Sequence, residues 1–424
     1  MKIAVCDLIV RFMERLGIGH VFGMPGAHIL PVYDRLYDSS IKSVLVKHEQ
    51  GASFMACGYT RASGRISACV ATAGPGATNL ITGIANAYVE KLPILVVTGE
   101  TSTFIFGKGG LQESSGEGGT IDQVALFRDI TRYQKTVERT DYLGQVLKQA
   151  AKILQAPASG PVLLSIPYNV QKELVEEAIL DDIPFAGTAS PVCSRYGAAA
   201  DLAHMIVAAQ HPVVVAGHGC FLSGAQDVLR QLSTLRNLPV ATTLKAKGLV
   251  DEDSPLALGC LGVTSDGRAF RHIVDHADLV IFLGAGFNER TSYLWDARLL
   301  AGKLVVQVDH DAAQIEKVFK ADLAIQGDIR AVLDDVLEAI AAAGSAPPPP
   351  PRVPAEVLPH FTVIARFFAG LVAKCPQGTQ IFDDNIILAQ TYLKAAPQHR
   401  YYPNTGISSL GYAIPAAIGA RCVV

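Results

Sequence analysis

A carboxylate that follows an apolar strand is the first candidate for chemistry in this sequence. Glu49 lies in the segment HEQGA (residues 48–52), directly after a strand expected over residues 43–46. Ligands of parallel α/β sheets bind beyond the carboxyl ends of the strands. A carboxylate there can hydrogen-bond a ring nitrogen of a cofactor. The alternative is a solvated glutamate that favours a helix start through the helix dipole.

A second strand-to-helix turn contains the segment GPG at residues 74–76, which opens with Gly74. Its glycines allow a close approach of the backbone, and the helix expected over residues 77–90 offers free N–H groups at its start, near Asn79. The segment lacks the lysine and the serine or threonine of a phosphate-binding P-loop. A plain tight turn is therefore the alternative.

Residues 107–119 form a long glycine-rich stretch that contains Gln112. Loops of this kind often act as lids or binding loops. The amide of Gln112 can orient a substrate oxygen. A surface loop without a role in binding is the alternative.

The second half of the chain offers weaker signals. Gly217 and Gly219 follow an apolar strand, but the next glycine is too far along for the dinucleotide motif GxGxxG. Arg290 follows another strand, and an arginine there suits a carboxylate or phosphate, with a surface ion pair to Glu289 or Asp296 as the alternative. The eleven histidines form no cluster typical of a metal site, and the eight cysteines contain no CxxC pair.

Alternating strands and helices should position these residues. Continuous apolar runs predict strands over residues 43–46, 66–71, 94–98, 212–216, 279–283, 304–308 and 380–382. Helical periodicity lies between them, over residues 77–90, 225–236, 329–340, 361–373 and 411–420. This alternation predicts an α/β fold of parallel sheets flanked by helices on both faces.

Two shifts in composition divide the chain into domains. We expect an N-terminal domain over residues 1–185, a central α/β domain over 186–345 and a proline-rich linker over 346–359. Five consecutive prolines make that linker stiff and extended. Residues 360–424 begin a third domain, which we expect to be incomplete because it is too short to match the other two.

Composition limits the classes of partner. Of the 424 residues, 50% are hydrophobic and 18% are charged, below the roughly 25% usual in soluble domains, which predicts large buried surfaces and an oligomer. The net charge of −3 gives no electrostatic reason to expect nucleic acid or an anionic membrane. No apolar run approaches the ~20 residues of a membrane span. Scattered cysteines fit a reducing compartment, so a cytoplasmic location is expected.

Taken in order, the motifs resemble those of the thiamin-diphosphate-dependent enzymes of the acetolactate synthase (acetohydroxyacid synthase large subunit) group. The matching segments are FGMPG (residues 22–26), LPVYD (30–34), HEQGA (48–52), GYTRASG (58–64), GPGATN (74–79), QE (112–113), GPVLLSIP (160–167) and SLGYAIPAAIGA (409–420). They cover essentially the whole chain. The resemblance implies three α/β domains, which are pyrimidine-binding, central and diphosphate-binding, with the third truncated.

The resemblance also implies roles for individual residues. Glu49 would hold the aminopyrimidine of the cofactor and favour the imino tautomer that removes the thiazolium proton, while Gln112 would face the reacting centre. Leu410 would press the cofactor into a bent conformation. The implied cofactor-binding residues are Pro25, Gly26, Gly74, Asn79, Gly406, Ser408 and Leu410. Arg290, with Gly217 and Gly219, would meet the substrate or FAD.

The implied activity is carboligation: decarboxylation of a 2-oxo acid such as pyruvate, then transfer of the two-carbon unit to a second carbonyl. The family's site lies between two subunits, so a homodimer or tetramer is implied, and a regulatory subunit is a further candidate partner. Thiamin diphosphate and Mg²⁺ are the implied cofactors, with FAD as a candidate. The metal ligands are expected beyond Val424, with none in this chain. We therefore expect the 424-residue chain alone to bind thiamin diphosphate negligibly and to lack carboligase activity.

Departures from the family pattern keep other activities open. Met24 and Ala27 stand where the family has tyrosine and glycine, Leu111 replaces a phenylalanine, and Gly286 replaces an arginine. The alternatives are a sulfoacetaldehyde acetyltransferase, a 2-oxo acid or oxalyl-CoA decarboxylase on the same cofactor, or a non-catalytic truncated relative.

Overall fold

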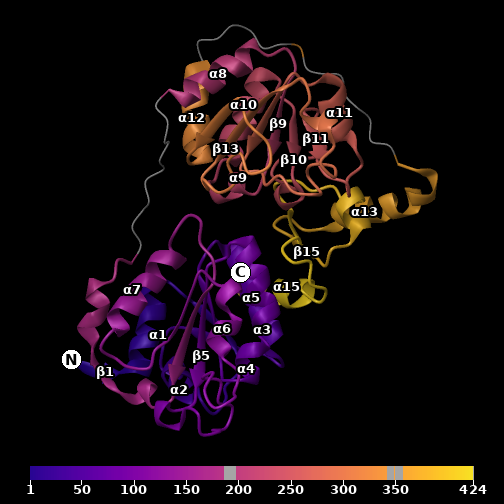
Figure 1. Cartoon of the computed structure of the whole chain (residues 1–424). Helices are drawn as coiled ribbons and strands as arrows, with labels where there is room; N and C mark the ends of the chain where they lie inside the picture. Colours follow the sequence, from indigo (N-terminus) through magenta and orange to yellow (C-terminus); the bar gives the residue numbers. More distant parts are fainter. Residues whose placement is uncertain (186–196, 341–347, 349–356, 424) are drawn as a thin grey trace. The chain divides into compact units, whose positions relative to one another are not determined.

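The computed structural model describes residues 1–185, 197–340, 348 and 357–423. By its internal contacts the chain forms two compact units. The first unit consists of Met1–Thr188 with Asn404–Val424, and the second unit is Ala189–Pro403 (Figure 1). The domain boundaries expected near residues 186 and 346, and most of the proline-rich linker, lie outside the described residues.

The first unit is built on a six-stranded parallel sheet with the strand order β3-β2-β4-β5-β7-β6. Its strands are β2 (His20–Gly23), β3 (Lys42–Leu45), β4 (Ser67–Ala71), β5 (Ile94–Glu100), β6 (Tyr133–Thr136) and β7 (Val162–Pro167). Two short strands, β1 (Lys2–Ala4) and β8 (Leu174–Glu176), pair antiparallel beside it. The all-parallel pairing confirms the α/β fold expected from the alternation of strands and helices.

Helices cover both faces of this sheet (Figure 1). On one face lie α1 (Val5–Arg15), α2 (Leu30–Tyr37) and α7 (Leu143–Leu154). On the other lie α3 (Glu49–Ser63) and α5 (Ile81–Glu90), while α4 (Pro75–Thr78) and α6 (Gln123–Leu126) are single turns. The helix expected over residues 77–90 is therefore two helices, α4 and α5. The chain turns between them because Leu80 N–H bonds the carbonyl of Ala77, three residues back.

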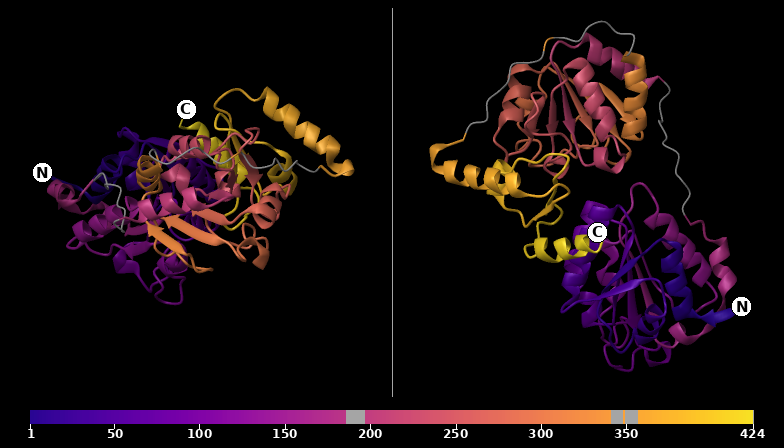
Figure 2. Two further views of the ribbon diagram at one scale, coloured as in Figure 1. Left: turned by 90° about the horizontal axis from the view of Figure 1, so that it is seen from above. Right: turned by 180° about the vertical axis from the view of Figure 1, so that it is seen from behind.

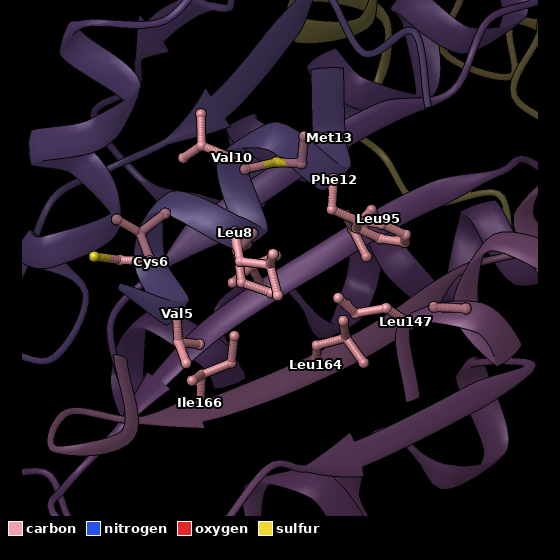
Figure 3. Close-up of a cluster of buried hydrophobic side chains, with 14 of the residues drawn as sticks. Val5, Cys6, Leu8, Val10, Phe12, Met13, Leu95, Leu147, Leu164 and Ile166 are labelled. Carbon is pink, nitrogen blue, oxygen red and sulfur yellow. The ribbon is translucent and has the colours of Figure 1, made fainter. Parts of the chain in front are cut away.

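The helical periodicity of α1 explains how the first core forms. Its buried apolar residues recur at the three- and four-residue spacing that places side chains on one face of a helix: Val5, Leu8, Ile9, Phe12 and Met13. Figure 3 shows this face packed over the sheet, against Leu95 of β5 and Leu164 and Ile166 of β7, with Leu147 of α7 beside them. The apolar strand runs thus become a sheet that is buried on both faces.

The second unit repeats this plan with the strand order β11-β10-β9-β12-β13-β14, all parallel. Its strands are β9 (Pro212–Ala216), β10 (Val240–Thr242), β11 (Ala257–Cys260), β12 (Leu279–Leu283), β13 (Leu304–Asp309) and β14 (Leu323–Gln326). On one face lie α8 (Ala198–Ala208), α10 (Gln226–Arg236) and α12 (Ile329–Ile340), and on the other α11 (Arg268–His276). Figure 2 shows these layers from two further directions.

Several smaller elements complete the second unit, and most of them follow the proline-rich segment. They are α13 (Thr362–Lys374), α14 (Ile387–Tyr392) and a two-stranded parallel sheet of β15 (Gln380–Asp383) and β16 (Arg400–Pro403). A single turn, α9 (Gly219–Leu222), follows β9. No helix among the residues that the structure describes is both long and apolar enough to cross a membrane.

The last helix, α15 (Ala413–Arg421), packs in the first unit against α3, and glycines set the distance between the two helices. A Cβ atom at Gly58 of α3 would lie 2.0 Å from the carbonyl oxygen of Ala416. A Cβ atom at Gly419 would lie 2.0 Å from that of Met55. The two backbones can therefore touch only because each helix presents a glycine at its contact.

Candidate active site

The first sheet has one natural place for a ligand. The chain leaves β2 for β3 on one side, and β4 then returns to the other side of β2, so the loops after β2 and β4 diverge at a topological switch point. Gly26 in the first loop lies against Thr72 in the second, and a Cβ atom at Gly26 would be 2.6 Å from that of Thr72. Pro25 beside it is exposed. The close approach of these loops explains why residue 26 is a glycine.

Glu49 is the first residue of α3 and is 4% exposed. One of its carboxylate oxygens accepts a hydrogen bond of 2.9 Å from the side-chain amide of Asn79. The other oxygen has no hydrogen-bond partner among the described residues. The free N–H groups of the helix start favour a negative charge at this position. Glu49 is thus a buried carboxylate with one oxygen available to a ligand, not the solvated glutamate of the alternative interpretation.

Tyr33 provides a second sign of the environment around Glu49. Its hydroxyl donates a hydrogen bond of 3.0 Å to the carbonyl of Val70. Burial raises the pKa of Tyr33, and the nearby Cys69 and Glu49 raise it further. The neighbourhood of Glu49 is therefore poorly solvated, so hydrogen bonds and charges act strongly there.

The turn at Gly74 follows β4. Its φ of +59° and ψ of −115° suit glycine, and its N–H donates a hydrogen bond of 3.3 Å to the side-chain oxygen of Gln123. Gln123 is fully buried and also donates to the carbonyl of Gly99 and the hydroxyl of Ser165. Gln123 thus links the turn after β4 to β5 and β7. The N–H of Gly74 is used within the protein rather than for a ligand.

Gln112 connects the glycine-rich loop to this turn. Its backbone is left-handed, with φ +53°, and its side-chain oxygen accepts a hydrogen bond of 3.2 Å from the hydroxyl of Thr72. The same oxygen lies 3.3 Å from Nδ1 of His28. A Cβ atom at Gly74 would lie 3.4 Å from that of Gln112. The structure thus brings Gln112 to the switch point, beside Gly26 and Gly74.

Glu113 holds the glycine-rich loop in shape. Its buried carboxylate accepts hydrogen bonds from the N–H groups of Gly107, Gly109 and Gly110 and from the hydroxyl of Ser115. The N–H of Gly110 first, with those of Gly107 and Gly109, keeps the pKa of Glu113 below its ordinary value. The loop around residue 112 is therefore an ordered structure rather than a loose surface segment.

Gly406, the first of the expected C-terminal cofactor residues, lies against α5 in the same unit. A Cβ atom at Gly406 would be 2.3 Å from the side-chain oxygen of Asn86, which also accepts a hydrogen bond from the N–H of Ile407. Ser408 has a left-handed backbone with φ +54°. The side chain of Leu410 is 75% exposed. An exposed leucine here is available to contact a ligand, as its expected wedge role requires.

The second unit holds the remaining candidates. Gly217 and Gly219 lie at the switch point between β9 and β12, where Cβ atoms would be 2.1 Å from the carbonyl oxygen and 2.8 Å from the Cα of Gly284. Their glycine identity is thus explained by packing against the β12 loop. The guanidinium of Arg290 donates to the side-chain oxygens of Asn385, at 3.0 Å, and Gln390, at 3.4 Å. Arg290 therefore bonds two side-chain amides, and not Glu289 or Asp296 as in the alternative interpretation.

Sequence reasoning missed several residues of the site. It did not single out His28, Thr72 or Gln123, which connect Gln112 and Gly74 to the sheet. It also missed the buried hydrogen bond of 3.2 Å from Arg61 of α3 to the hydroxyl of Tyr412. His28 does follow a strand end closely, which is a usable signal, whereas the others depend on contacts between distant segments.

The polar side chains of this site fit the pyrimidine part of the expected cofactor, whereas the described residues provide no metal site. Glu49 has the free oxygen that a protonated ring nitrogen or amino group requires, so these residues fit the pyrimidine part of thiamin diphosphate. Among the residues that the structure describes, no group of three or more His, Cys, Asp or Glu side chains could hold a metal ion.

Comparison with known families agrees with this geometry. Residues 3–126 match the family described as thiamine pyrophosphate enzyme, N-terminal TPP binding domain. Residues 199–336 match thiamine pyrophosphate enzyme, central domain. The first match contains Glu49, Gly74 and Gln112, and the second contains Gly217 and Arg290.

Individual proteins show the same relationship over nearly the whole chain. The probable acetolactate synthase large subunit of Methanocaldococcus jannaschii is 30% identical over 440 residues, covering 98% of this chain and 73% of that protein. The acetolactate synthase isozyme 1 large subunit of Escherichia coli K12 is 32% identical, covering 98% and 74%. The acetolactate synthase large subunit of Pyropia yezoensis is 31% identical, covering 99% and 72%. The chain therefore belongs to the thiamin-diphosphate (thiamine pyrophosphate) enzymes, in the acetolactate synthase large-subunit family.

Proposed function

We propose that this enzyme is a carboligase that decarboxylates a 2-oxo acid such as pyruvate and transfers the two-carbon unit to a second carbonyl compound. The observation that carries the proposal is Glu49, a buried carboxylate with one free oxygen at the carboxyl end of a parallel sheet. Gln112 lies at the switch point of the same sheet. Both residues belong to the segment that matches the thiamin-diphosphate-binding domain.

Thiamin diphosphate, when bound, supplies a carbon nucleophile and a sink for the electrons released by decarboxylation. The chain's own part begins at Glu49, whose free oxygen would accept a hydrogen bond from a pyrimidine nitrogen of the bound cofactor. Asn79 fixes the carboxylate by its hydrogen bond of 2.9 Å to the other oxygen. A carboxylate in this poorly solvated position binds a protonated ring nitrogen and so favours the tautomer that can remove a proton.

Gln112 performs the second task, which is orientation. Its side-chain oxygen is engaged by Thr72, so its amide group has a fixed plane and its N–H₂ can donate to a substrate oxygen. Because Glu113 and its glycines hold the surrounding loop, this donor is positioned before the substrate arrives. A carboxylate or carbonyl of a 2-oxo acid is the group that such a donor orients.

The experiment measures exchange of the thiazolium C2 proton with deuterium by NMR. Weak binding of the diphosphate is expected for this chain, so thiamin diphosphate and Mg²⁺ are supplied at millimolar concentration. The chain is expected to accelerate the exchange over that of free cofactor. Glu49→Gln removes the carboxylate while keeping the shape of the side chain, and it should abolish the acceleration.

Glu338→Gln is the matched control, because Glu338 is an exposed glutamate on α12 in the second unit. It should exchange like the unaltered chain. Equal rates for Glu49→Gln and the unaltered chain would remove Glu49 from the mechanism. No acceleration by any of the three proteins would contradict the proposed activity for this chain.

Product analysis separates the reactions of this cofactor. With pyruvate as the substrate, the carboligase produces carbon dioxide and a five-carbon 2-hydroxy-3-oxo acid. A simple decarboxylase releases an aldehyde instead. Sulfoacetaldehyde with phosphate, and oxalyl-CoA, test the other two alternatives in the same assay. The substrates that are turned over decide between them.

The partners and the second cofactor complete the proposal. The relatives are named as large subunits, so we expect a homodimer or tetramer and a regulatory subunit as a further partner. FAD is the ligand proposed for the switch point at Gly217 and Gly219, with Arg290 as a further contact. Yellow purified protein that releases flavin on denaturation would support it. Colourless protein whose absorbance and melting temperature ignore added FAD would contradict it.

A further inference from the structure

His28 is a histidine at the switch point to which no role has yet been given. It follows the loop after β2 and is 9% exposed. Its Nδ1 lies 3.3 Å from the side-chain oxygen of Gln112, the residue proposed to orient the substrate. The ring therefore lies one hydrogen bond away from Gln112.

The surroundings fix the position of His28 from several sides. Its N–H donates to the hydroxyl of Thr72 at 3.3 Å, and its carbonyl accepts a hydrogen bond of 2.7 Å from the buried side chain of Gln171. Gly99 at the end of β5 lies so close that a Cβ atom there would be 2.2 Å from the carbonyl oxygen of His28. Four segments of the first unit thus hold one histidine, although nothing in the fold's core requires an imidazole there.

The hydrogen bonds also determine which ring nitrogen carries the proton. The side-chain oxygen of Gln112 can only accept hydrogen bonds, and it accepts one from the hydroxyl of Thr72. The Nδ1 of His28 that contacts the same oxygen must therefore be the protonated nitrogen of the neutral ring. The Nε2 then carries a lone pair, and it has no hydrogen-bond partner among the described residues.

We propose that His28 is a proton-transfer residue of the active site, with its tautomer set by Gln112. This inference rests on the proposed function. Joining two carbonyl compounds opens the π bond of one carbonyl to form the new carbon–carbon bond, and the alkoxide oxygen left behind requires a proton to become a hydroxyl. The reaction also requires removal of a proton from a hydroxyl that becomes a carbonyl when the product leaves. Nε2 uses its lone pair to take up the proton of that hydroxyl and gives it to the oxygen that becomes the new hydroxyl, so the ring ends each cycle as it began.

The direct test is the tautomer itself, which needs neither cofactor nor substrate. The chain is labelled with ¹⁵N in its histidine rings, and the signal missing from His28→Asn identifies residue 28 in long-range ¹H–¹⁵N spectra. We expect the Nδ1–H form at neutral pH, whereas free histidine in water prefers Nε2–H. In Gln112→Leu, the His28 ring should return to the Nε2–H form. An Nε2–H pattern in the unaltered chain, or no change in Gln112→Leu, would overturn the proposal.

The second test is kinetic, and it supplies thiamin diphosphate and Mg²⁺ at the same millimolar concentration, which compensates for the weak binding expected of this chain. His28→Ala should accelerate C2 proton exchange as the unaltered chain does, yet lower turnover by on the order of 10²- to 10⁴-fold, the usual contribution of a positioned acid–base group. Added imidazole should restore part of that rate. His204→Ala, at an exposed position on α8, should match the unaltered chain and ignore imidazole.

The two tests separate failure of this inference from failure of the proposed function. Loss of C2 exchange in Glu49→Gln together with normal turnover in His28→Ala would retain the proposed function and overturn the role of His28. A turnover loss in His28→Ala that imidazole does not restore would also overturn it, because packing alone would then explain the loss. If C2 exchange is not accelerated at all, the proposed function fails, and the role of His28 in proton transfer fails with it.

Discussion

Glu100 and Glu113 are two buried glutamates that support the same loop, and their pKa values are shifted in opposite directions. Glu100 ends β5 and accepts hydrogen bonds from the N–H groups of Thr101 and Ser114. Desolvation nevertheless dominates and raises the pKa of Glu100, while the N–H donors around Glu113 lower the pKa of that residue. A raised pKa opposes folding as the group ionises, and a lowered pKa favours folding once it has ionised.

Glu100→Gln should therefore stabilise the first unit near neutral pH. In the unaltered chain the pKa of Glu100 is higher in the folded state than in the unfolded state. The unaltered chain therefore has its full stability below the unfolded pKa and loses part of it as the pH rises through the folded pKa. The amide oxygen keeps an acceptor for Thr101 and Ser114 but carries no charge. Urea denaturation across this range should show the gain growing with pH. A gain that is constant with pH would contradict the electrostatic explanation.

Glu113→Gln should show the reverse dependence. The lowered pKa in the folded state gives stability that is present above the unfolded pKa and lost as pH falls through the folded pKa. The variant should be less stable than the unaltered chain near neutral pH, and the difference should shrink in acid. Hydrogen exchange of the amides of Gly109 and Gly110, which donate to Glu113, should speed up in the same variant. Unchanged exchange would show that Glu113 does not hold the loop.

Some site residues belong to short local sequence motifs, whereas others are recognised only by contacts between distant segments. Glu49 and Gln112 could be found from the sequence because each belongs to a short motif beside a strand end or in a glycine-rich loop. The contacts of His28 and Thr72 with Gln112, and the hydrogen bond from Gly74 to Gln123, join residues that are 40 or more positions apart. No local pattern records such contacts, so the network around Gln112 required the structure.

At the scale of elements, the contact between α3 and α15 makes the sharpest prediction. Gly58→Ala places a Cβ atom 2.0 Å from the carbonyl oxygen of Ala416, which belongs to a helix backbone and cannot move aside cheaply. We expect α15 to separate from α3 and the first unit to lose about 1–3 kcal/mol of stability, as in overpacked cores. Thermal unfolding measures the loss, and hydrogen exchange in α15 should identify the helix that is released.

Gly51→Ala is the matched control for that variant, because it makes the same change in the same helix. No atom lies within 4 Å of a Cβ at Gly51. Replacing a glycine inside a helix by alanine should stabilise by about 0.5–1 kcal/mol. Similar destabilisation by the two variants would show that the close contact at Gly58 is not the cause.

Sequence patterns predicted the elements better than the junctions between them. Long apolar runs, such as those of β9, β12 and β13, gave strands close to their observed bounds because burial on both faces leaves few polar interruptions. The helix expected over residues 77–90 failed at Asn79. The side chain of Asn79 bonds Glu49, a tertiary contact at the break between α4 and α5 that helical periodicity does not reveal.

At the scale of the whole molecule, each unit has its own hydrophobic core. In the first unit, Leu8 and Leu164 belong to the cluster between α1 and the sheet. In the second unit, Ile281 and Val306 belong to the cluster beneath α8, α10 and α12. Since neither cluster shares residues with the other, the chain should unfold in two steps rather than one.

Leu164→Ala and Ile281→Ala should each shift a different step. A buried leucine or isoleucine replaced by alanine typically loses about 2–5 kcal/mol, because the cavity adds to the lost transfer free energy. Hydrogen exchange read by mass spectrometry assigns each step to its peptides. Faster exchange throughout both units in Leu164→Ala would instead indicate one cooperative molecule.

The pairing of α15 with α3 also constrains how the protein is made. The ribosome completes residues 49–63 long before residues 413–421, so α3 leaves the exit tunnel with its glycine surface uncovered. The second unit is synthesised entirely within that interval and can fold on its own core. The first unit therefore begins to be synthesised before the second, and its contact between α3 and α15 forms only after the second unit has been made. Until α15 arrives, the face of α3 that contains Gly58 is open to chaperones, or to the α15 of another nascent chain on the same messenger RNA.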